Sequence, residues 1–168
     1  IQPTIHGLAA DGLRYRGFLY AGIMVTADGT PKVLEYNCRF GDPETQPILL
    51  RLKSDLLDLV EAACHGGLAN QIAVWDSRAA LGVIMAAAGY PGNYPKGRLI
   101  RLGQDMADTK VFHAGTTMNH DQPVTSGGRV LCVTALGSGV REAQAKAYER
   151  LKTIEFEGAE YRTDIGYR

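Results

Sequence analysis

Apolar and polar residues alternate near the start of the chain in a pattern that predicts a β-hairpin. Residues 18–26 are rich in large apolar and β-branched side chains, which favours a strand. Asp28-Gly29 follows as a strong hairpin turn signal, and residues 32–39 then alternate between polar and apolar side chains. We therefore expect two antiparallel strands, the second of which presents one polar face.

Helical patterns precede and follow this hairpin. A short helix is expected within residues 1–16. The Gly-Asp-Pro-Glu turn at 41–44 ends the second strand, and Pro43 is the expected first residue of a helix. A further helix is predicted from Ser54, as its N-cap, to the glycine pair at 66–67. Its expected buried stripe consists of Leu56, Leu57, Leu59, Val60 and Ala63.

The pattern changes across residues 68–78, which we interpret as a domain boundary anchored by Trp75. Beyond it, apolar runs of strand length and one stretch with helical spacing indicate a mixed fold. The expected strands are 80–88, 111–114 and 129–136, and the helix has its apolar stripe on Val140, Ala143, Ala147 and Leu151. The predicted fold class is α+β, divided into residues 1–70 and residues 71–168.

Composition and charge exclude several classes of protein. The 168 residues contain 18 Lys and Arg and 18 Asp and Glu, so there is no basic excess that would indicate a nucleic-acid surface. No apolar run is long enough to suggest a membrane span. The three cysteines, Cys38, Cys64 and Cys132, lack paired spacing and are expected to be reduced core residues of a cytoplasmic protein. The chain begins at Ile1, and we expect it to be a fragment of a longer protein.

Three polar residues on the predicted second strand carry the candidate chemistry. Glu35, Asn37 and Arg39 stand two residues apart, so a strand would point all three the same way. Carboxylate and amide oxygens suit Mg²⁺ held between protein and nucleotide phosphates, and a guanidinium can meet a phosphate oxygen. The pattern therefore indicates phosphoryl transfer, although the same alternation also describes any half-buried strand with one wet face.

Other candidate residues follow this strand. Asp42 and Glu44 could hold an ammonium group or accept a proton from an attacking amine, or they could simply be acids at a helix N-terminus. The glycine-rich stretch at 89–92 lacks a phosphate-loop pattern and is expected to be a structural turn. His113 is expected to be a packed, hydrogen-bonded strand residue rather than a catalytic one.

Several stretches together resemble one family. Residues 15–46, and within them the run Arg-Phe-Gly-Asp-Pro-Glu at 39–44, are similar to the phosphoribosylamine–glycine ligases, or glycinamide ribonucleotide synthetases, of the ATP-grasp superfamily. The similarity continues at residues 86–92, 111–116, 127–131 and 164–167. It implies that residues 1–70 are the C-terminal part of an ATP-grasp domain, an antiparallel hairpin plus helices. Residues 71–168 would be the family's small α+β C-terminal domain.

The resemblance also implies a function. The family joins glycine to 5-phosphoribosylamine with ATP, through a glycyl phosphate, in purine biosynthesis. Glu35 and Asn37 are then expected to bind Mg²⁺ or Mn²⁺ and, with Arg39, the phosphates of ATP. Arg39, Asp42 and Glu44 are expected to act in catalysis.

Two departures from the superfamily pattern qualify this expectation. Residues 18–26 contain no acid, where many ATP-grasp enzymes carry a second metal ligand. The adenine pocket and the phosphate-covering lid would lie upstream of Ile1, so we expect the chain to need a missing N-terminal segment of the same protein and to be inactive alone. Two alternatives stay open, a non-catalytic scaffold fragment and another carboxylate–amine ligase of the superfamily.

Overall fold

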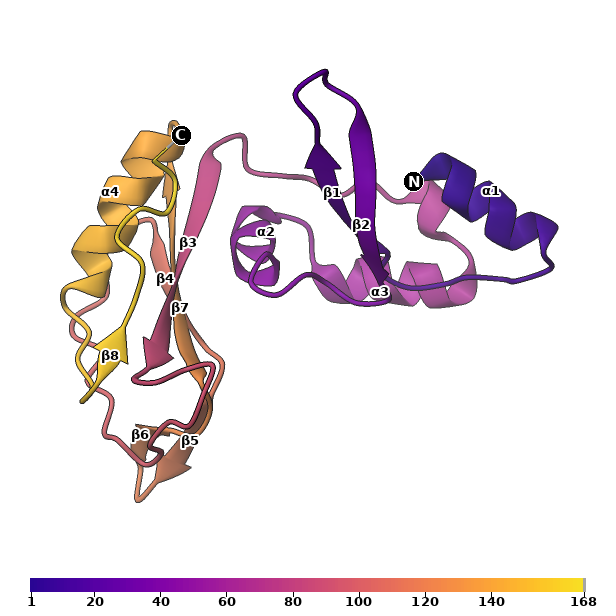
Figure 1. The fold of residues 1–168 in the computed structure, drawn as a ribbon. Helices are drawn as coiled ribbons and strands as arrows, with labels where there is room; N and C mark the ends of the chain where they lie inside the picture. The colour runs from indigo at the N-terminus through magenta and orange to yellow at the C-terminus, as the bar shows by residue number, and fades with distance from the viewer. Residues whose placement is uncertain (168) are drawn as a thin grey trace. The chain divides into compact units, whose positions relative to one another are not determined.

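The computed structural model describes residues 1–167, which form two compact units (Figure 1). The first unit comprises residues 1–42 and 53–74, and the second comprises residues 43–52 and the chain from Trp75 onward. The crossing between Val74 and Trp75 falls inside the segment predicted as a boundary. The assignment of residues 1–70 and 71–168 to two domains stays a prediction.

The first unit is built around the predicted hairpin. Its elements are α1 (Gln2–Ala10), β1 (Tyr20–Val25), β2 (Pro31–Asn37), α3 (Leu56–His65) and the short 3-10 helix η1 (Leu68–Asn70). β1 and β2 pair antiparallel across the Asp28-Gly29 turn, where Gly29 adopts the positive φ of 83° that such a turn requires. The predicted hairpin is thus confirmed, but β2 ends at Asn37, before Arg39.

Helix α3 differs from its prediction in two ways. Its N-cap is Asp55, whose carboxylate accepts a hydrogen bond from the Leu57 amide at 2.7 Å, because Ser54 is engaged elsewhere. The Ser54 hydroxyl instead accepts a 2.7 Å hydrogen bond from the Val74 amide. The predicted buried stripe was also wrong, because no residue of α3 is buried and Leu57 is 62% exposed. The C-terminal end at Gly66, with φ of 77°, is confirmed.

The second unit is a four-stranded antiparallel sheet with helices packed against it. Its elements are α2 (Thr45–Arg51), β3 (Ala79–Ala87), β4 (Thr109–His113), β5 (Thr116–Asn119), β6 (Gln122–Thr125), β7 (Arg129–Gly137), α4 (Val140–Leu151) and β8 (Ala159–Glu160). The strand order is β4-β7-β3-β8, and β5 and β6 form a separate hairpin. α2 and α4 both contact the two central strands, β3 and β7.

The two faces of β3 explain how these helices are arranged. Leu81, Val83 and Met85 are buried in the core that α4 covers (Figure 1). Gly82 faces the other way, where an added Cβ would lie 3.5 Å from the Pro47 ring of α2. α2 therefore lies on the face opposite α4, and β7, which lies between β3 and β4, is buried along almost its whole length. Because α2 is part of this unit, the chain after Glu44 is anchored to the sheet.

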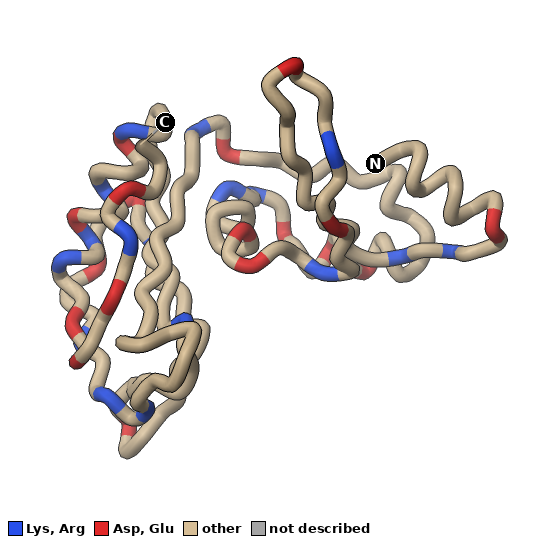
Figure 2. Tube along the Cα trace, viewed as in Figure 1, with Lys and Arg blue, Asp and Glu red and all other residues tan. Residues whose placement is uncertain are grey.

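Several details revise the expectations from sequence. α2 begins at Thr45 with Glu44 as its N-cap residue, two positions later than Pro43. Cys38 and Cys64 are exposed rather than in a core, whereas Cys132 is buried as predicted. None of the helices formed by residues 1–167 is long and apolar enough to cross a membrane. Basic and acidic residues alternate along α4 and are interspersed elsewhere (Figure 2).

Candidate functional site

The hairpin holds Glu35 and Asn37 on regular strand backbone. Glu35 pairs with Gly22 across the hairpin, and Asn37 pairs with Tyr20. A Cβ at Gly22 would come within 3.1 Å of the Glu35 Cγ, so the glycine leaves room for the Glu35 side chain to lie across β1. Because the two residues are two positions apart on one strand, their side chains share a face, as predicted.

The end of β2 is fixed by aromatic contacts. The rings of Phe18 and Phe40 lie with their centroids 4.0 Å apart, which joins the segment before β1 to the segment after β2. A hydrogen bond with Cys38 raises the pKa of the Tyr15 phenol above its usual value. The contact between the two phenylalanine rings supports the backbone directly after Arg39.

Arg39 itself lies in a bend beyond the strand. Its Nη1 donates a 2.8 Å hydrogen bond to the Phe40 carbonyl, and its side chain is exposed. The prediction that the strand continues to Arg39 was therefore wrong. Arg39 cannot be assigned to the strand face of Glu35 and Asn37, because the alternation of side chains ends where the strand ends.

Asp42 and Glu44 are the first and last residues of the turn at 42–44 that follows. Asp42 is exposed and ends the first part of the first unit. Glu44 is half-buried and belongs to the second unit, where its carbonyl accepts a 3.2 Å hydrogen bond from the Ile48 amide in the first turn of α2. α2 thus fixes the Glu44 backbone relative to the sheet.

The oxygen donors available to a cation are few. Among residues 1–167, no group of three or more His, Cys, Asp and Glu side chains could hold a metal ion. Glu35 and Asn37 offer one carboxylate and one amide oxygen from adjacent positions on a strand face. This donor set fits Mg²⁺, which keeps several waters and takes one or two protein ligands together with substrate phosphates.

The remaining sequence candidates have structural partners. The His113 ring nitrogen Nδ1 lies 3.0 Å from the Thr116 hydroxyl, so the predicted hydrogen bond is confirmed, although the side chain is exposed rather than packed. In the glycine-rich loop, the Tyr90 ring occupies the space that a Cβ of Gly128 would need, at 2.1 Å. Arg129 Nε donates to the Tyr90 hydroxyl at 3.1 Å. The glycine-rich loop is therefore a structural turn, held by the contacts of Tyr90 with Gly128 and Arg129.

Two polar residues on α2 were missed from sequence. Gln46 has a buried amide oxygen that accepts no hydrogen bond within the described chain. Arg51 lines a cavity beside Trp75. Gln46 stands at the end of the family-like stretch 15–46 and Arg51 stands outside it, and only the packing of α2 on the sheet brings their side chains to notice.

Comparison with known families decides what kind of protein this hairpin and sheet belong to. Residues 80–168, more than half of the chain, match the family model described as phosphoribosylglycinamide synthetase, C domain. Residues 1–45 match the model described as phosphoribosylglycinamide synthetase, ATP-grasp (A) domain. The chain belongs to the phosphoribosylglycinamide synthetase family. The predicted family and the predicted α+β fold, the end of an ATP-grasp domain followed by the family's C-terminal domain, are confirmed.

Individual relatives agree with the phosphoribosylglycinamide synthetase assignment. The chain is 58% identical over 171 residues to a phosphoribosylamine–glycine ligase of Escherichia coli O6:H1, and 56% identical over 170 residues to one of Vibrio cholerae. Both alignments cover 100% of this chain and 40% of the relative. The chain thus spans about 40% of the length of these phosphoribosylglycinamide synthetase relatives.

Solved structures give the same picture of the fold. The crystal structure of phosphoribosylamine–glycine ligase from Thermotoga maritima matches with a TM-score of 0.83 and 38% identity, over 96% of this chain and 40% of that one. A biotin carboxylase from Campylobacter jejuni matches with a TM-score of 0.67 at 11% identity, over 98% of this chain and 37% of that one. The second match shows that this chain shares its fold with more distant proteins.

Proposed function

We propose that the protein is the C-terminal part of a ligase that joins glycine to 5-phosphoribosylamine with ATP. The observation that carries the proposal is the 56–58% identity, over the whole of this chain, to proteins named as phosphoribosylamine–glycine ligases. The products would be glycinamide ribonucleotide, ADP and phosphate. We also propose a cytoplasmic location, in keeping with three free cysteines.

The chemistry explains why the proposed residues suit this reaction. The glycine carboxylate and the γ-phosphate of ATP are both anionic, so their reaction depends on positioning and on neutralising charge. Bound Mg²⁺ or Mn²⁺ would supply that neutralisation at the phosphates. Glu35 and Asn37 offer oxygen ligands for the cation, and Arg39 offers guanidinium donors to a phosphate oxygen whose charge increases in the transition state.

Asp42 and Glu44 are proposed to act on the amine side of the reaction. The 5-phosphoribosylamine nitrogen displaces phosphate from the glycyl phosphate and loses a proton as the amide forms. A carboxylate at Asp42 or Glu44 could hold the ammonium group of glycine or accept this proton.

We further propose that residues outside this chain complete the site. The hairpin exposes a set of large apolar side chains that a folded enzyme would be expected to cover. The exposed side chains are Ile23, Met24, Val25, Val33, Leu34 and Tyr36. The N-terminal part of the same protein is the proposed cover, because the relatives extend well beyond the aligned region.

A chimaera tests the proposal. This chain would replace the 171 aligned residues of the Escherichia coli relative, and ADP release would be measured with glycine, 5-phosphoribosylamine and Mg-ATP. The expected result is ADP release that depends on all three substrates, with glycinamide ribonucleotide identified by mass. ADP release that proceeds equally with a different carboxylate or amine would favour another ligase of the superfamily.

A further inference from the structure

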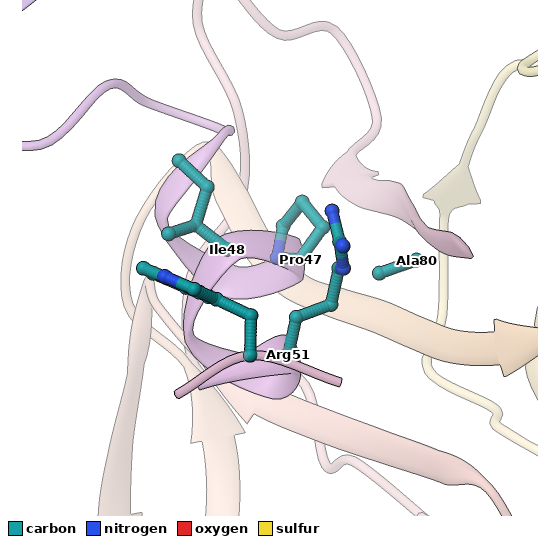
Figure 3. A pocket seen from close by; sticks show the side chains of 5 residues that line it. Pro47, Ile48, Arg51 and Ala80 are labelled. Atoms are coloured by element: carbon teal, nitrogen blue, oxygen red, sulfur yellow. The ribbon is translucent and has the colours of Figure 1, made fainter. Parts of the chain in front are cut away.

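A cavity of about 540 Å³ lies in the second unit, against α2. Four of its lining residues are apolar or aromatic, and one is basic. The lining consists of Pro47, Ile48, Arg51, Trp75 and Ala80. In Figure 3 the Arg51 side chain extends beside Pro47, with its guanidinium between the Pro47 ring and Ala80. The single charged group is therefore held among apolar walls.

Backbone hydrogen bonds fix this guanidinium in place. Arg51 Nε and Nη2 both donate to the Asp76 carbonyl, at 3.1 and 2.9 Å. The Asp76 amide donates in return to the Arg51 carbonyl at 2.7 Å, and Leu52 forms a β-bridge with Trp75. Arg51 is thus oriented before any ligand arrives, which lowers the entropic cost of binding.

The positive charge of Arg51 has no carboxylate partner in the described part of the chain. The side-chain carboxylate of Asp76, whose own carbonyl Arg51 contacts, instead pairs with Arg78, whose Nη2 lies 2.9 Å from Asp76 Oδ2. Among residues 1–167, the Arg51 guanidinium donates hydrogen bonds to the Asp76 carbonyl. Partly buried charges are usually paired, so an oriented guanidinium with only a carbonyl partner is an unusual feature that favours an external anion.

We propose that this cavity binds a phosphate or carboxylate group carried on a flat, apolar body. The anion would meet Nη1 of Arg51, which donates to no atom of residues 1–167. The body would lie against Trp75, which is 46% exposed, and against Ile48. The site does not rest on the ligase proposal, because its residues are separate from Glu35, Asn37 and Arg39.

The chain carries its own reporter for this site. Trp75 is the only tryptophan among the 168 residues, so its emission reports the cavity directly. The test titrates the chain with phenyl phosphate, with inorganic phosphate for the charged group alone, and with benzyl alcohol for the body alone. Phenyl phosphate should change the tryptophan emission saturably and should bind at least tenfold more tightly than inorganic phosphate. Its binding should weaken at high salt. Benzyl alcohol should give no saturable change.

Two variants and a control complete the test. Arg51→Met removes the charge, and Ile48→Glu places an acid in the cavity wall without touching the Arg51 hydrogen bonds. Each should weaken phenyl phosphate binding at least tenfold, whereas Arg141→Met, on the exposed side of α4, should leave it unchanged. If Arg51→Met does not fold, Ile48→Glu decides. No saturable change in the original chain, or equal binding by the folded variants, would overturn the proposal.

Discussion

At the scale of single residues, the strongest expectation concerns Glu35. In the active chimaera, Glu35→Gln should lower kcat a hundredfold or more, about 3 kcal/mol of transition-state stabilisation, because a neutral amide is a poorer cation ligand than a carboxylate. The measurement is kcat across a range of MgCl₂ concentrations. Glu61→Gln, an exposed acid on α3, is the matched control and should behave like the parent. Unchanged activity and metal dependence in Glu35→Gln would remove the metal-ligand role.

Arg39 allows a test that separates charge from geometry. Arg39→Lys keeps the positive charge but loses the planar fork of donors, so it should lower kcat/KM at least tenfold. Steady-state kinetics with ATP as the varied substrate measures this, with Arg14→Lys, an exposed arginine of the same unit, as control. Equal kinetics for both variants and the parent would show that Arg39 serves only its hydrogen bond to the Phe40 carbonyl.

Alternation along the sequence predicted some of these positions and not others. Glu35 and Asn37 share a strand face because β2 is regular between them, and a period of two is then a matter of geometry. Arg39 did not follow this alternation because the strand ends at Asn37. A pattern of polar residues does not show where the hydrogen bonds between two strands end. Arg51 was invisible to sequence analysis, because its environment comes from segments 25 residues apart.

At the scale of elements, α4 offers a test by pH. Glu142 reaches back to the Ser138 amide and hydroxyl, at 2.7 and 2.6 Å, and also pairs with Lys146. Hydrogen bonds from Ser138, followed by the one from Lys146, lower the pKa of Glu142 to about 2. Glu142→Gln should therefore lower the urea midpoint of the chain at pH 7, while Glu149→Gln on the same helix should not.

The sign of this effect sets its pH window. A carboxyl whose pKa is lower in the folded state contributes stability above its ordinary pKa of 4.5 and loses it as the pH falls toward 2. The difference in urea midpoint between the parent and Glu142→Gln should accordingly be constant from pH 7 to pH 5 and shrink between pH 4.5 and pH 2. A difference that grows on acidification would contradict the assignment.

The elements of the second unit were the easiest to predict, with instructive exceptions. Ala143, Ala147 and Leu151 of α4 are buried as the helical spacing predicted, whereas Val140, the first residue of the predicted stripe, is 44% exposed. Arg150 is buried as well, with 1% of its surface exposed. The Arg150 Nη1 donates a hydrogen bond to the Leu102 carbonyl, so this charged residue is buried where a backbone acceptor is available. The β5–β6 hairpin was missed because His120 and Asp121 take positive φ values, 44° and 63°, without the glycine that usually marks such a turn.

At the scale of the whole molecule, the first unit shows where the spacing of apolar residues fails to predict burial. An apolar stripe predicts burial only if something packs against it. In α3 the stripe is present and correctly spaced, yet Leu57 and Val60 are 62% and 36% exposed. The second unit has a sheet covered on both faces, and there the same reasoning succeeded. Apolar spacing therefore predicted burial where the described chain supplies the packing partners, as in the second unit, and failed where it does not, as in α3.

The last prediction follows from this difference. The 168-residue chain alone should release no ADP above background with glycine, 5-phosphoribosylamine and Mg-ATP, whereas the chimaera should turn over. Phosphoryl transfer relies on positioning and charge stabilisation, and this chain offers one strand with two oxygen ligands, one arginine and an acidic turn. Adding the N-terminal part of the Escherichia coli relative as a separate polypeptide should restore some activity by covering the apolar hairpin. Turnover by the chain alone would show that its own residues suffice for nucleotide binding and catalysis.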